Sequence, residues 1–227
     1  MSQSTPTKPL SIPRVVAIPG LLTLGVTILR LVGELRHWSK VWFNPEVGGA
    51  WAIVGIVWLV PVFGIYFARK LAAAGHGPKS PKLAVQFAGL GVLVVLVAVL
   101  FGVRAPISNP FLRAVFFLWM PFLTAALLQL YAWPALAKTL FAYAFTARVP
   151  VAILMFFALW GQWGTHYDAV PENLPEMSFA LKYLWLGLLP QLVFWVGFTV
   201  LVGSLAGNVS LALKQSPKAI RTIEGRE

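Results

Sequence analysis

Long apolar segments separated by short polar connectors constrain the fold of this chain more than any other feature. The segment 83–103, for example, contains no charged residue, and a helix that spans a bilayer needs about 20 predominantly apolar residues. Across all 227 residues, 59% are apolar and 11% are charged, whereas soluble domains average about 45–50% and about 25%. The sequence therefore predicts an all-α membrane protein and excludes an ordinary water-soluble fold.

Six segments of this kind predict a polytopic bundle of six transmembrane helices, in a single domain over residues 15–213. The first segment is too long for the core of a signal peptide and no small-residue cleavage site follows it, so we expect it to be retained as a helix. Residues 1–14 are expected to form an N-terminal tail and residues 214–227 a basic C-terminal tail. The six expected spans are 15–35, 51–67, 83–103, 112–133, 140–160 and 179–206.

The distribution of basic residues predicts that both termini are cytoplasmic. With the N-terminus inside, the cytoplasmic tails and connectors carry 11 Lys and Arg residues, and the outer connectors carry 5. Membrane proteins retain positive charge on the cytoplasmic side. We therefore expect a multi-pass protein of the bacterial inner membrane, with most of its carboxylates on the outer side.

Composition and motifs exclude several classes of function. The chain contains no Cys, which excludes disulfides, thiolate catalysis and iron–sulfur clusters. Its net charge of +11 comes from residues that flank apolar segments, so it favours contact with membrane lipids over nucleic acid. The motifs of classical hydrolases are absent, and all three His residues lie at or beyond the expected helix ends, where they do not suit haem. We expect no cofactor, and an enzyme is the less favoured class.

Arg148 is the most informative residue because it lies within the fifth expected span. An unpaired arginine at this depth costs at least about 2.5 kcal/mol, and no acidic residue lies at a similar depth in another span. A guanidinium among neutral acceptors suits an anion, a lipid phosphate or a carboxylate. The alternative is an arginine that snorkels to the interface and is capped by carbonyls. Its possible neutral partners are Gln86, Gln129, Tyr131, Gln191 and carbonyls freed by Pro150.

Arg30 and Glu34 lie four residues apart near the outer end of the first expected span. On a helix this spacing places both side chains on one face, where they can pair. Such a pair can line a polar vestibule between helices, or it can fix the rotation of its own helix while Arg30 reaches the interface. The sequence leaves both interpretations open.

The segment that follows the fifth span combines glycine, aromatic, histidine and carboxylate side chains. If it is extended, His166 and Asp168 point the same way. They could then meet a second polar group from the first helix and connector, which comprises Glu34, His37 and Glu46. A His-x-Asp pair alone is a weak metal motif. We therefore favour a histidine–carboxylate hydrogen bond that holds the outer loop, and we predict no metal.

Glycines and prolines within the spans predict close packing and kinks. Gly203 and Gly207 form a pair spaced by four residues, and Gly91 lies in the third span. Small residues at such positions allow neighbouring helices to approach closely. Prolines such as Pro150 and Pro190 are expected to kink their helices and to free carbonyl groups.

Two functions of different classes are compatible with these features. In the first, a small anionic or amphipathic solute is bound or transported through a polar site between helices, with Arg148, Gln191, Gln129, Arg30 and Glu34 as the ligand-binding residues. In the second, the chain is a non-catalytic membrane subunit or scaffold, whose partner is another protein or a second copy of itself. An intramembrane enzyme is a less favoured third possibility.

Overall fold

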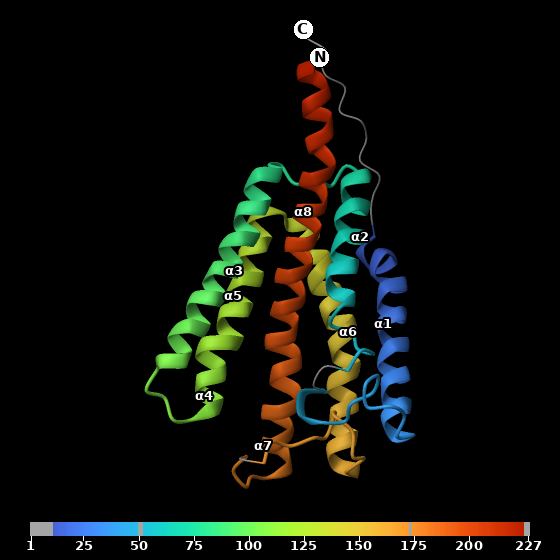
Figure 1. Ribbon diagram of the computed structural model, residues 1–227, viewed down its shortest axis with the longest axis vertical. Coiled ribbons are helices and arrows are strands. Elements are labelled where there is room, and N and C mark those ends of the chain that lie inside the picture. Colours follow the sequence, from blue (N-terminus) through green and yellow to red (C-terminus); the bar gives the residue numbers. More distant parts are fainter. Residues whose placement is uncertain (1–10, 50–51, 173, 225–227) are drawn as a thin grey trace.

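The computed structural model describes residues 11–49, 52–172 and 174–224, which form a bundle of six helical columns that run alternately in opposite directions (Figure 1). Four columns are single helices, namely α1 (Ile12–Leu35), α2 (Leu59–Ala73), α3 (Pro81–Arg104) and α6 (Pro134–Gly161). The fourth column joins α4 (Pro110–Ala114), the π-helical turn η2 (Val115–Trp119) and α5 (Met120–Ala132). The last column joins α7 (Phe179–Tyr183), the π-helical turns η3 (Leu184–Leu188) and η4 (Pro190–Phe194), and α8 (Trp195–Glu224).

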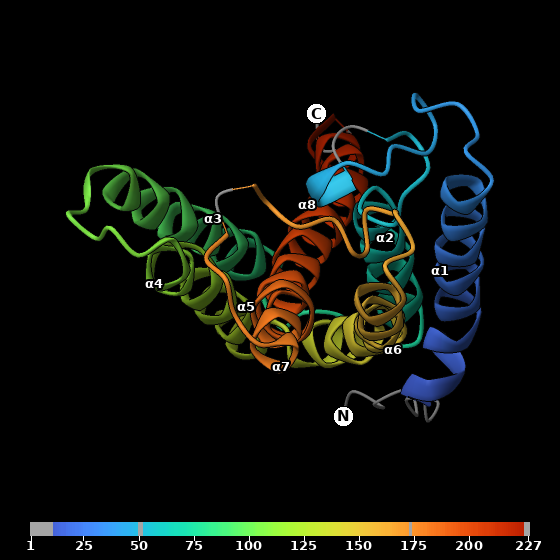
Figure 2. The ribbon, with the colours of Figure 1, turned by 90° about the horizontal axis from the view of Figure 1, so that it is seen from below.

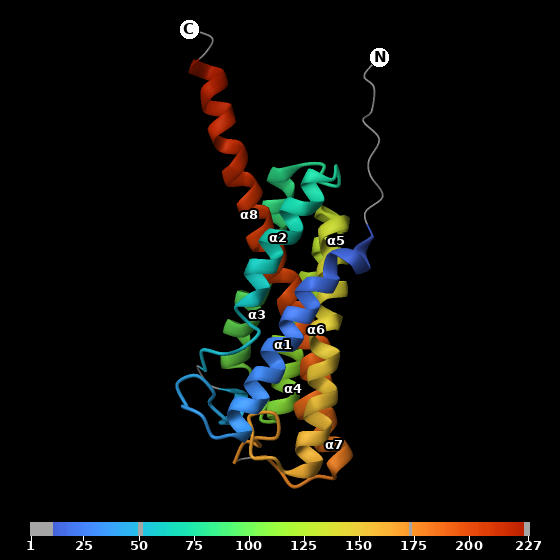
Figure 3. The same ribbon diagram turned by 90° about the vertical axis from the view of Figure 1, so that its right-hand side faces the viewer.

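The two ends of the bundle differ in character. Helix α1 begins toward the end from which α8 projects, and we call this the terminal end (Figures 1 and 3). The opposite end, which we call the loop end, holds the segments 36–49, 52–58 and 162–172. The first of these contains the single 3-10 turn η1 (Val47–Gly49). The candidate site described below lies at the loop end.

Helix borders follow local sequence rules. Helix α3 begins at Pro81 after Ser80, whose hydroxyl accepts a hydrogen bond from a backbone N–H of the first turn at 3.3 Å. At α4, the side-chain oxygen of Asn109 accepts two such bonds, at 2.9 and 3.1 Å. Ser and Asn satisfy N–H groups that a helix start leaves unpaired, and a proline in the first turn has no N–H to satisfy. The Pro-rich connectors therefore set the borders of these columns.

The π-helical turns lie beside two prolines. Turn η2 comes just before Pro121, and Pro190 begins η4. A proline cannot donate to the carbonyl four residues earlier, and a wider turn nearby absorbs the interruption. Near Pro121 and Pro190 the helix type therefore changes locally, whereas α6 continues through Pro150 as an α-helix.

Five helical segments are long and apolar enough to cross a membrane. This supports the class predicted from the sequence, a multi-pass helical membrane protein. The exception among the six columns is α2, whose 15 residues extend about 22 Å, less than the hydrocarbon thickness of about 30 Å. The six-span count and the orientation stay predictions. The five segments are Ile12–Leu35, Pro81–Arg104, Pro110–Ala132, Pro134–Gly161 and Phe179–Lys214.

The second expected span, 51–67, differs from the helix that forms, which is α2 (Leu59–Ala73). Residues 52–58 are irregular because they pair with the preceding connector: the N–H groups of Ile53 and Val54 donate to the carbonyls of Val41 and Trp42 at 3.2 and 3.1 Å. Residue 51, where the span was expected to begin, lies outside the described residues. Hydropathy could not show this pairing, because it does not distinguish an apolar connector from an apolar helix.

Two other borders also differ from expectation. Helix α6 begins at Pro134 instead of residue 140, so Arg148 lies near its middle, 14 residues after the start and 13 before Gly161. Helix α8 continues to Glu224, so residues 214–224 of the expected basic tail extend the last helix. The first of these differences places the charge of Arg148 deeper in the bundle than the sequence indicated.

Helix α8 is the central element of the bundle and packs against α2, α3, α5 and α6. Viewed along the bundle, α3 and α5 lie on one side of α8, and α1, α2 and α6 lie on the other (Figure 2). Glycines allow α2 and α8 to come into backbone contact. A Cβ atom at Gly64 would collide with the carbonyl oxygen of Gly203, and a Cβ atom at Gly207 would lie 2.8 Å from the Cβ of Ala68. The close approach predicted from Gly203 and Gly207 is therefore present between α2 and α8.

A buried aromatic cluster fixes α1 and α2 on α6. The Tyr143 ring is 1% exposed and packs edge-on against Phe63 and Phe67, with ring centroids 5.3 and 5.5 Å away. Its hydroxyl is hydrogen-bonded to the hydroxyl of Thr23 on α1 at 2.8 Å. These contacts set the height of α1 relative to α6, and hence the position of the polar residues near the end of α1.

The predicted orientation can be tested by labelling, because the chain has no Cys of its own. Glu46 at the loop end and Lys79 at the terminal end are both exposed. We expect Glu46→Cys to react with a membrane-impermeant maleimide in intact cells, and Lys79→Cys to react only after permeabilisation. The reverse pattern would mean that the orientation is inverted. Labelling of both variants in intact cells would mean that α2 does not cross the membrane, which contradicts the six-span prediction.

The contact between α2 and α8 predicts a large effect for a small substitution. Gly64→Ala places a methyl group against the backbone of α8, and overpacking of this kind costs about 1–3 kcal/mol. Gly89→Ala is the matched control, because a Cβ atom there meets nothing within 4 Å while the gain in helix propensity is the same. We expect the thermal unfolding midpoint in detergent to fall for Gly64→Ala only. Equal midpoints for the two variants would contradict this packing.

Candidate functional site

A cavity of about 230 Å³ lies at the loop end, between α1, α6 and the π-helical part of the last column. Two connectors cover it: residues 36–58, which we call the first connector, and residues 162–178, which we call the second connector. Gly48, Ile56 and Val57 of the first and Ala169 and Pro171 of the second lie in its wall. Most of the lining is apolar. The polar side chains that reach it are those of Thr27, Arg30, Arg148, His166, Tyr167 and Gln191.

Arg148 enters the cavity from the middle of α6. Its side chain is buried, with the residue 4% exposed, and its Nε atom has no hydrogen-bond partner. Among the described residues, its one directional contact is with Trp195, whose ring centroid lies 4.6 Å from the guanidinium carbon. A cation over an indole face is stabilised by the ring electrons, but this contact leaves the N–H edge of the guanidinium unused. Arg148 is therefore a buried cation without a counter-charge in contact.

Arg30 and Glu34 form the ion pair that their spacing predicts, with Nε and Oε1 2.8 Å apart. Glu34 is 2% exposed. The same carboxylate accepts a hydrogen bond from the backbone N–H of His166 at 2.9 Å and contacts the Nδ1 atom of that residue at 2.8 Å. A histidine–carboxylate contact thus holds the second connector to α1, and its carboxylate partner is Glu34.

Arg30 also fixes the first connector. Its Nη2 donates to the carbonyls of Asn44 and Gly49, at 3.3 and 3.1 Å. A Cβ atom at Gly49 would collide with this guanidinium, and the φ angle of +64° there is one that glycine favours. We call Arg30, Glu34 and His166 the latch, because together they join α1 to both connectors that close the cavity.

The charges around the cavity do not cancel. The negative charge of Glu34 is matched by Arg30. Burial lowers the pKa of His166 below its ordinary value of 6.5, with Arg30 acting in the same direction and Glu34 and Asp168 opposing it, so the imidazole is neutral at pH 7. Burial also raises the pKa of Tyr167, which keeps its phenol neutral. Among the side chains that line the cavity and Glu34, one positive charge therefore remains, on Arg148, while Asp168 lines the pocket on the other side of the connector.

Gln191 adds a second unsatisfied group to the same wall. It is 7% exposed, its Nε2 donates to the sulfur of Met155 at 3.5 Å, and its Oε1 has no partner. A buried polar group without a partner costs about 1–3 kcal/mol. Two residues of the cavity wall, Arg148 and Gln191, thus each carry a buried polar atom without a hydrogen-bond partner.

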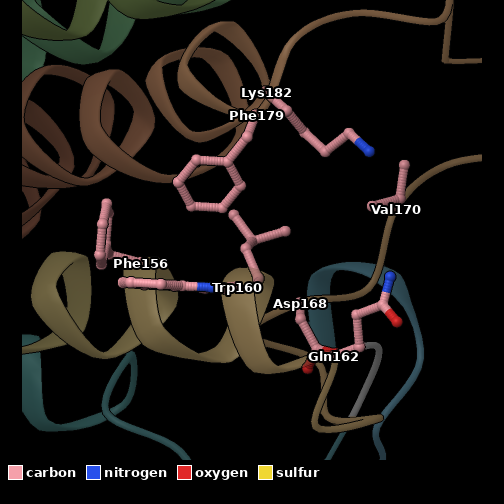
Figure 4. Close-up of a pocket in the computed structure, with 8 residues that line it drawn as sticks. Phe156, Trp160, Gln162, Asp168, Val170, Phe179 and Lys182 are labelled. Atoms are coloured by element: carbon pink, nitrogen blue, oxygen red, sulfur yellow. The ribbon is translucent and has the colours of Figure 1, made fainter.

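The second connector forms a thin wall between this cavity and a wider pocket. Asp168 supports the turn before the wall by accepting hydrogen bonds from the N–H groups of Gly164 and Thr165, at 2.9 and 2.8 Å. Beyond it, Ala169 and Pro171 line the cavity, whereas Asp168 and Val170 line the wider pocket of about 600 Å³. Figure 4 shows that pocket, with aromatic rings from α6 and α7 on one side and Gln162 and Asp168 on the other.

Of the ligand-binding residues predicted from sequence, Arg30, Arg148 and Gln191 line one cavity, and Glu34 holds Arg30 there. The structure does not bring Gln129 to it. Gln129 lies between α3 and α5, where its Nε2 donates to the carbonyls of Phe87 and Ala125 at 3.2 and 3.0 Å. Its amide satisfies helix backbone instead of facing Arg148.

The outer polar cluster is only partly assembled. His166 contacts Glu34, but Asp168 bonds to its own turn, and His37 and Glu46 are exposed. The sequence predicted that His166 and Asp168 would point the same way if the segment were extended, but residues 166–168 form a turn and the two side chains bond to different partners. Among the described residues, no group of three or more His, Cys, Asp or Glu side chains could hold a metal ion.

Sequence reasoning missed Trp195, the residue over which Arg148 lies. A signal was available, because Trp195 comes four residues after Gln191 and therefore shares a helix face with it. The apolar wall residues Met155 and Leu186 carried no comparable signal, since most residues in these spans are apolar.

Comparison of the chain with known protein families, curated proteins and solved structures finds no match in any of the three. The fold and the site define the class by themselves: a multi-pass helical membrane protein with a buried arginine, without an ion-pair partner among the described residues, in a cavity near one end of its bundle.

The buried latch predicts a pH dependence of stability. Because the pKa of His166 is lower in the folded than in the unfolded chain, the unfolded chain takes up a proton first as the pH falls below 6.5, and folding stability then declines. The stability contribution of a neutral His166 is therefore fully present above pH 6.5 and is lost below it. We expect the thermal unfolding midpoint of the wild type to exceed that of His166→Gln at pH 7.5, and we expect this difference to be smaller at pH 5.5.

His37→Gln is the control for this measurement, since His37 is exposed. The difference between the wild type and His37→Gln should not change over the same pH range. An advantage over His166→Gln that stays constant or widens toward low pH would contradict the lowered pKa.

Proposed function

We propose that this protein binds a small anionic or amphipathic solute in the cavity around Arg148. The observation that carries the proposal is a guanidinium in the middle of a membrane helix, 4% exposed, that faces a cavity and has no acidic partner among the described residues. An unpaired charge at this depth costs at least about 2.5 kcal/mol. An anion in the cavity would remove most of that cost, because a carboxylate or a similar group accepts two parallel hydrogen bonds from a guanidinium.

The surroundings of Arg148 favour binding over snorkelling. Its position near the middle of α6 keeps the side chain from either membrane surface. Trp195 packs on one face of the guanidinium and orients its N–H edge. If the charge of Arg148 only had to be stabilised within the protein, its guanidinium would be expected to donate hydrogen bonds to helix carbonyls. Among the described residues it makes no such hydrogen bond.

The location of the cavity sets the side of entry. If both termini are cytoplasmic, as the basic residues predict, the loop end faces outward and the solute reaches the cavity from outside. Transport of that solute is a further step of the same proposal, since a transporter must first hold what it moves. The alternative function, a non-catalytic subunit or scaffold, assigns the same residues to helix packing and predicts no ligand.

The test is ligand-dependent stabilisation of the purified protein. We expect at least one sodium salt among acetate, benzoate, sulfate and phosphate, compared at equal ionic strength, to raise the thermal midpoint of the wild type. A ligand at 100 times its Kd adds about 2.7 kcal/mol of stability. Arg148→Gln should remove the increase while the variant remains folded and monodisperse.

Arg69→Gln is the matched control, because Arg69 is exposed and lies on α2 toward the terminal end. It should respond to the salts as the wild type does. Stabilisation that persists in Arg148→Gln would reject this site, and the absence of any response in the wild type would favour the scaffold function.

A further inference from the structure

We infer that the solute is a small monocarboxylate with an apolar body, of about the size of benzoate. This inference rests on the proposed function and specifies its ligand. Three properties of the cavity carry it: the number of unpaired charges, the number of unused hydrogen-bond donors, and the volume enclosed by apolar walls.

The charge of the cavity suits a monoanion. Arg148 is the one cation among the described lining residues that lacks a counter-charge, since Arg30 is paired with Glu34 at 2.8 Å. A dianion such as sulfate would leave a negative charge uncompensated in an environment of low dielectric constant, which is costly. A single carboxylate makes the cavity neutral.

The supply of donors also favours a carboxylate. A tetrahedral oxyanion needs several donors around it to replace its hydration. Here Arg30 uses its Nε and Nη2 on Glu34 and two carbonyls, the Thr27 hydroxyl donates to its own helix at 3.0 Å, and the phenol of Tyr167 donates to the Thr27 carbonyl at 3.4 Å. The guanidinium edge of Arg148 and the Nη1 of Arg30 remain, and the planar fork of Arg148 matches the two oxygens of one carboxylate.

The remaining volume is apolar and small. Val151, Met155, Leu186 and Pro190 line it together with the indole of Trp195. An apolar cavity of about 150 Å³ can hold benzene, so about 230 Å³ has room for a six-membered ring with a carboxylate. Pockets for drug-sized ligands are larger, about 300–1,000 Å³, so the volume of the cavity suits a ligand of the size of benzoate.

The experiment is isothermal titration calorimetry of the detergent-purified full chain with sodium benzoate, cyclohexanecarboxylate, acetate, sulfate and phosphate, and with benzyl alcohol as the neutral analogue. We expect both ring carboxylates to bind. Acetate should bind at least about tenfold more weakly, because it lacks the apolar body. Benzyl alcohol, sulfate and phosphate should give no saturable heat.

Two variants locate the apolar body of the ligand. Leu186→Trp fills the cavity from the last column and should weaken benzoate binding at least about tenfold, while the weak binding of acetate persists. Leu127→Trp is the control for size and hydrophobicity, since Leu127 is 51% exposed on α5, away from the cavity; it should bind benzoate as the wild type does. Arg148→Gln should bind neither carboxylate.

The outcomes separate this inference from the function on which it rests. If sulfate or phosphate binds through Arg148 and benzoate does not, the ligand class is wrong and anion binding stands. Benzyl alcohol that binds as tightly as benzoate, or benzoate binding that is unchanged in Leu186→Trp, would also overturn the ligand class. If no anion gives saturable heat with the wild type, both the inference and the proposed function are wrong.

Discussion

The cost of burying charge where water is scarce is the constraint on which the loop end of this protein depends. Glu34 is 2% exposed, and a carboxylate in that position must be paired and hydrogen-bonded. Its two partners come from different parts of the chain: Arg30 from the preceding turn of α1, and His166 from a connector that lies 132 residues later. The requirement to satisfy one carboxylate therefore brings both connectors over the end of α1 and creates the roof of the cavity.

The same constraint explains why Arg148 stands out. The latch pairs Glu34 with Arg30, Asp168 is bonded to N–H groups of its own turn, and the close contact of α2 with α8 through Gly64 and Gly203 brings the last column into the centre of the bundle. The π-helical turns around Pro190 precede Trp195, which covers one face of the guanidinium. Packing thus holds Arg148 at a fixed place without giving it a counter-charge, which is the arrangement expected where a ligand supplies the missing negative group.

The class of fold followed from sequence because apolar segments of bilayer length have few other solutions. The pairing of Arg30 with Glu34 also followed, since it is local to one helix. What could not be predicted depends on contacts between distant segments. Residues 52–58 leave the helix because they pair with an earlier connector, and Gln129 bonds to α3 instead of Arg148. Hydropathy and spacing contain no information on which helices are neighbours, so the members of the cavity had to come from the structure.

The latch and the cavity are linked because one segment belongs to both. His166 bonds to Glu34 and also lines the cavity, and the residues after it form the wall toward the wider pocket. If an anion occupies the cavity, its charge favours the protonated form of His166, and linkage then requires that protonation of His166 strengthens binding of the anion by the same factor. Protonation also costs folding free energy, because burial disfavours the charged imidazole. The connector that carries His166 therefore links two effects of a lower pH, a decrease in folding stability and, for a bound anion, a gain in its binding.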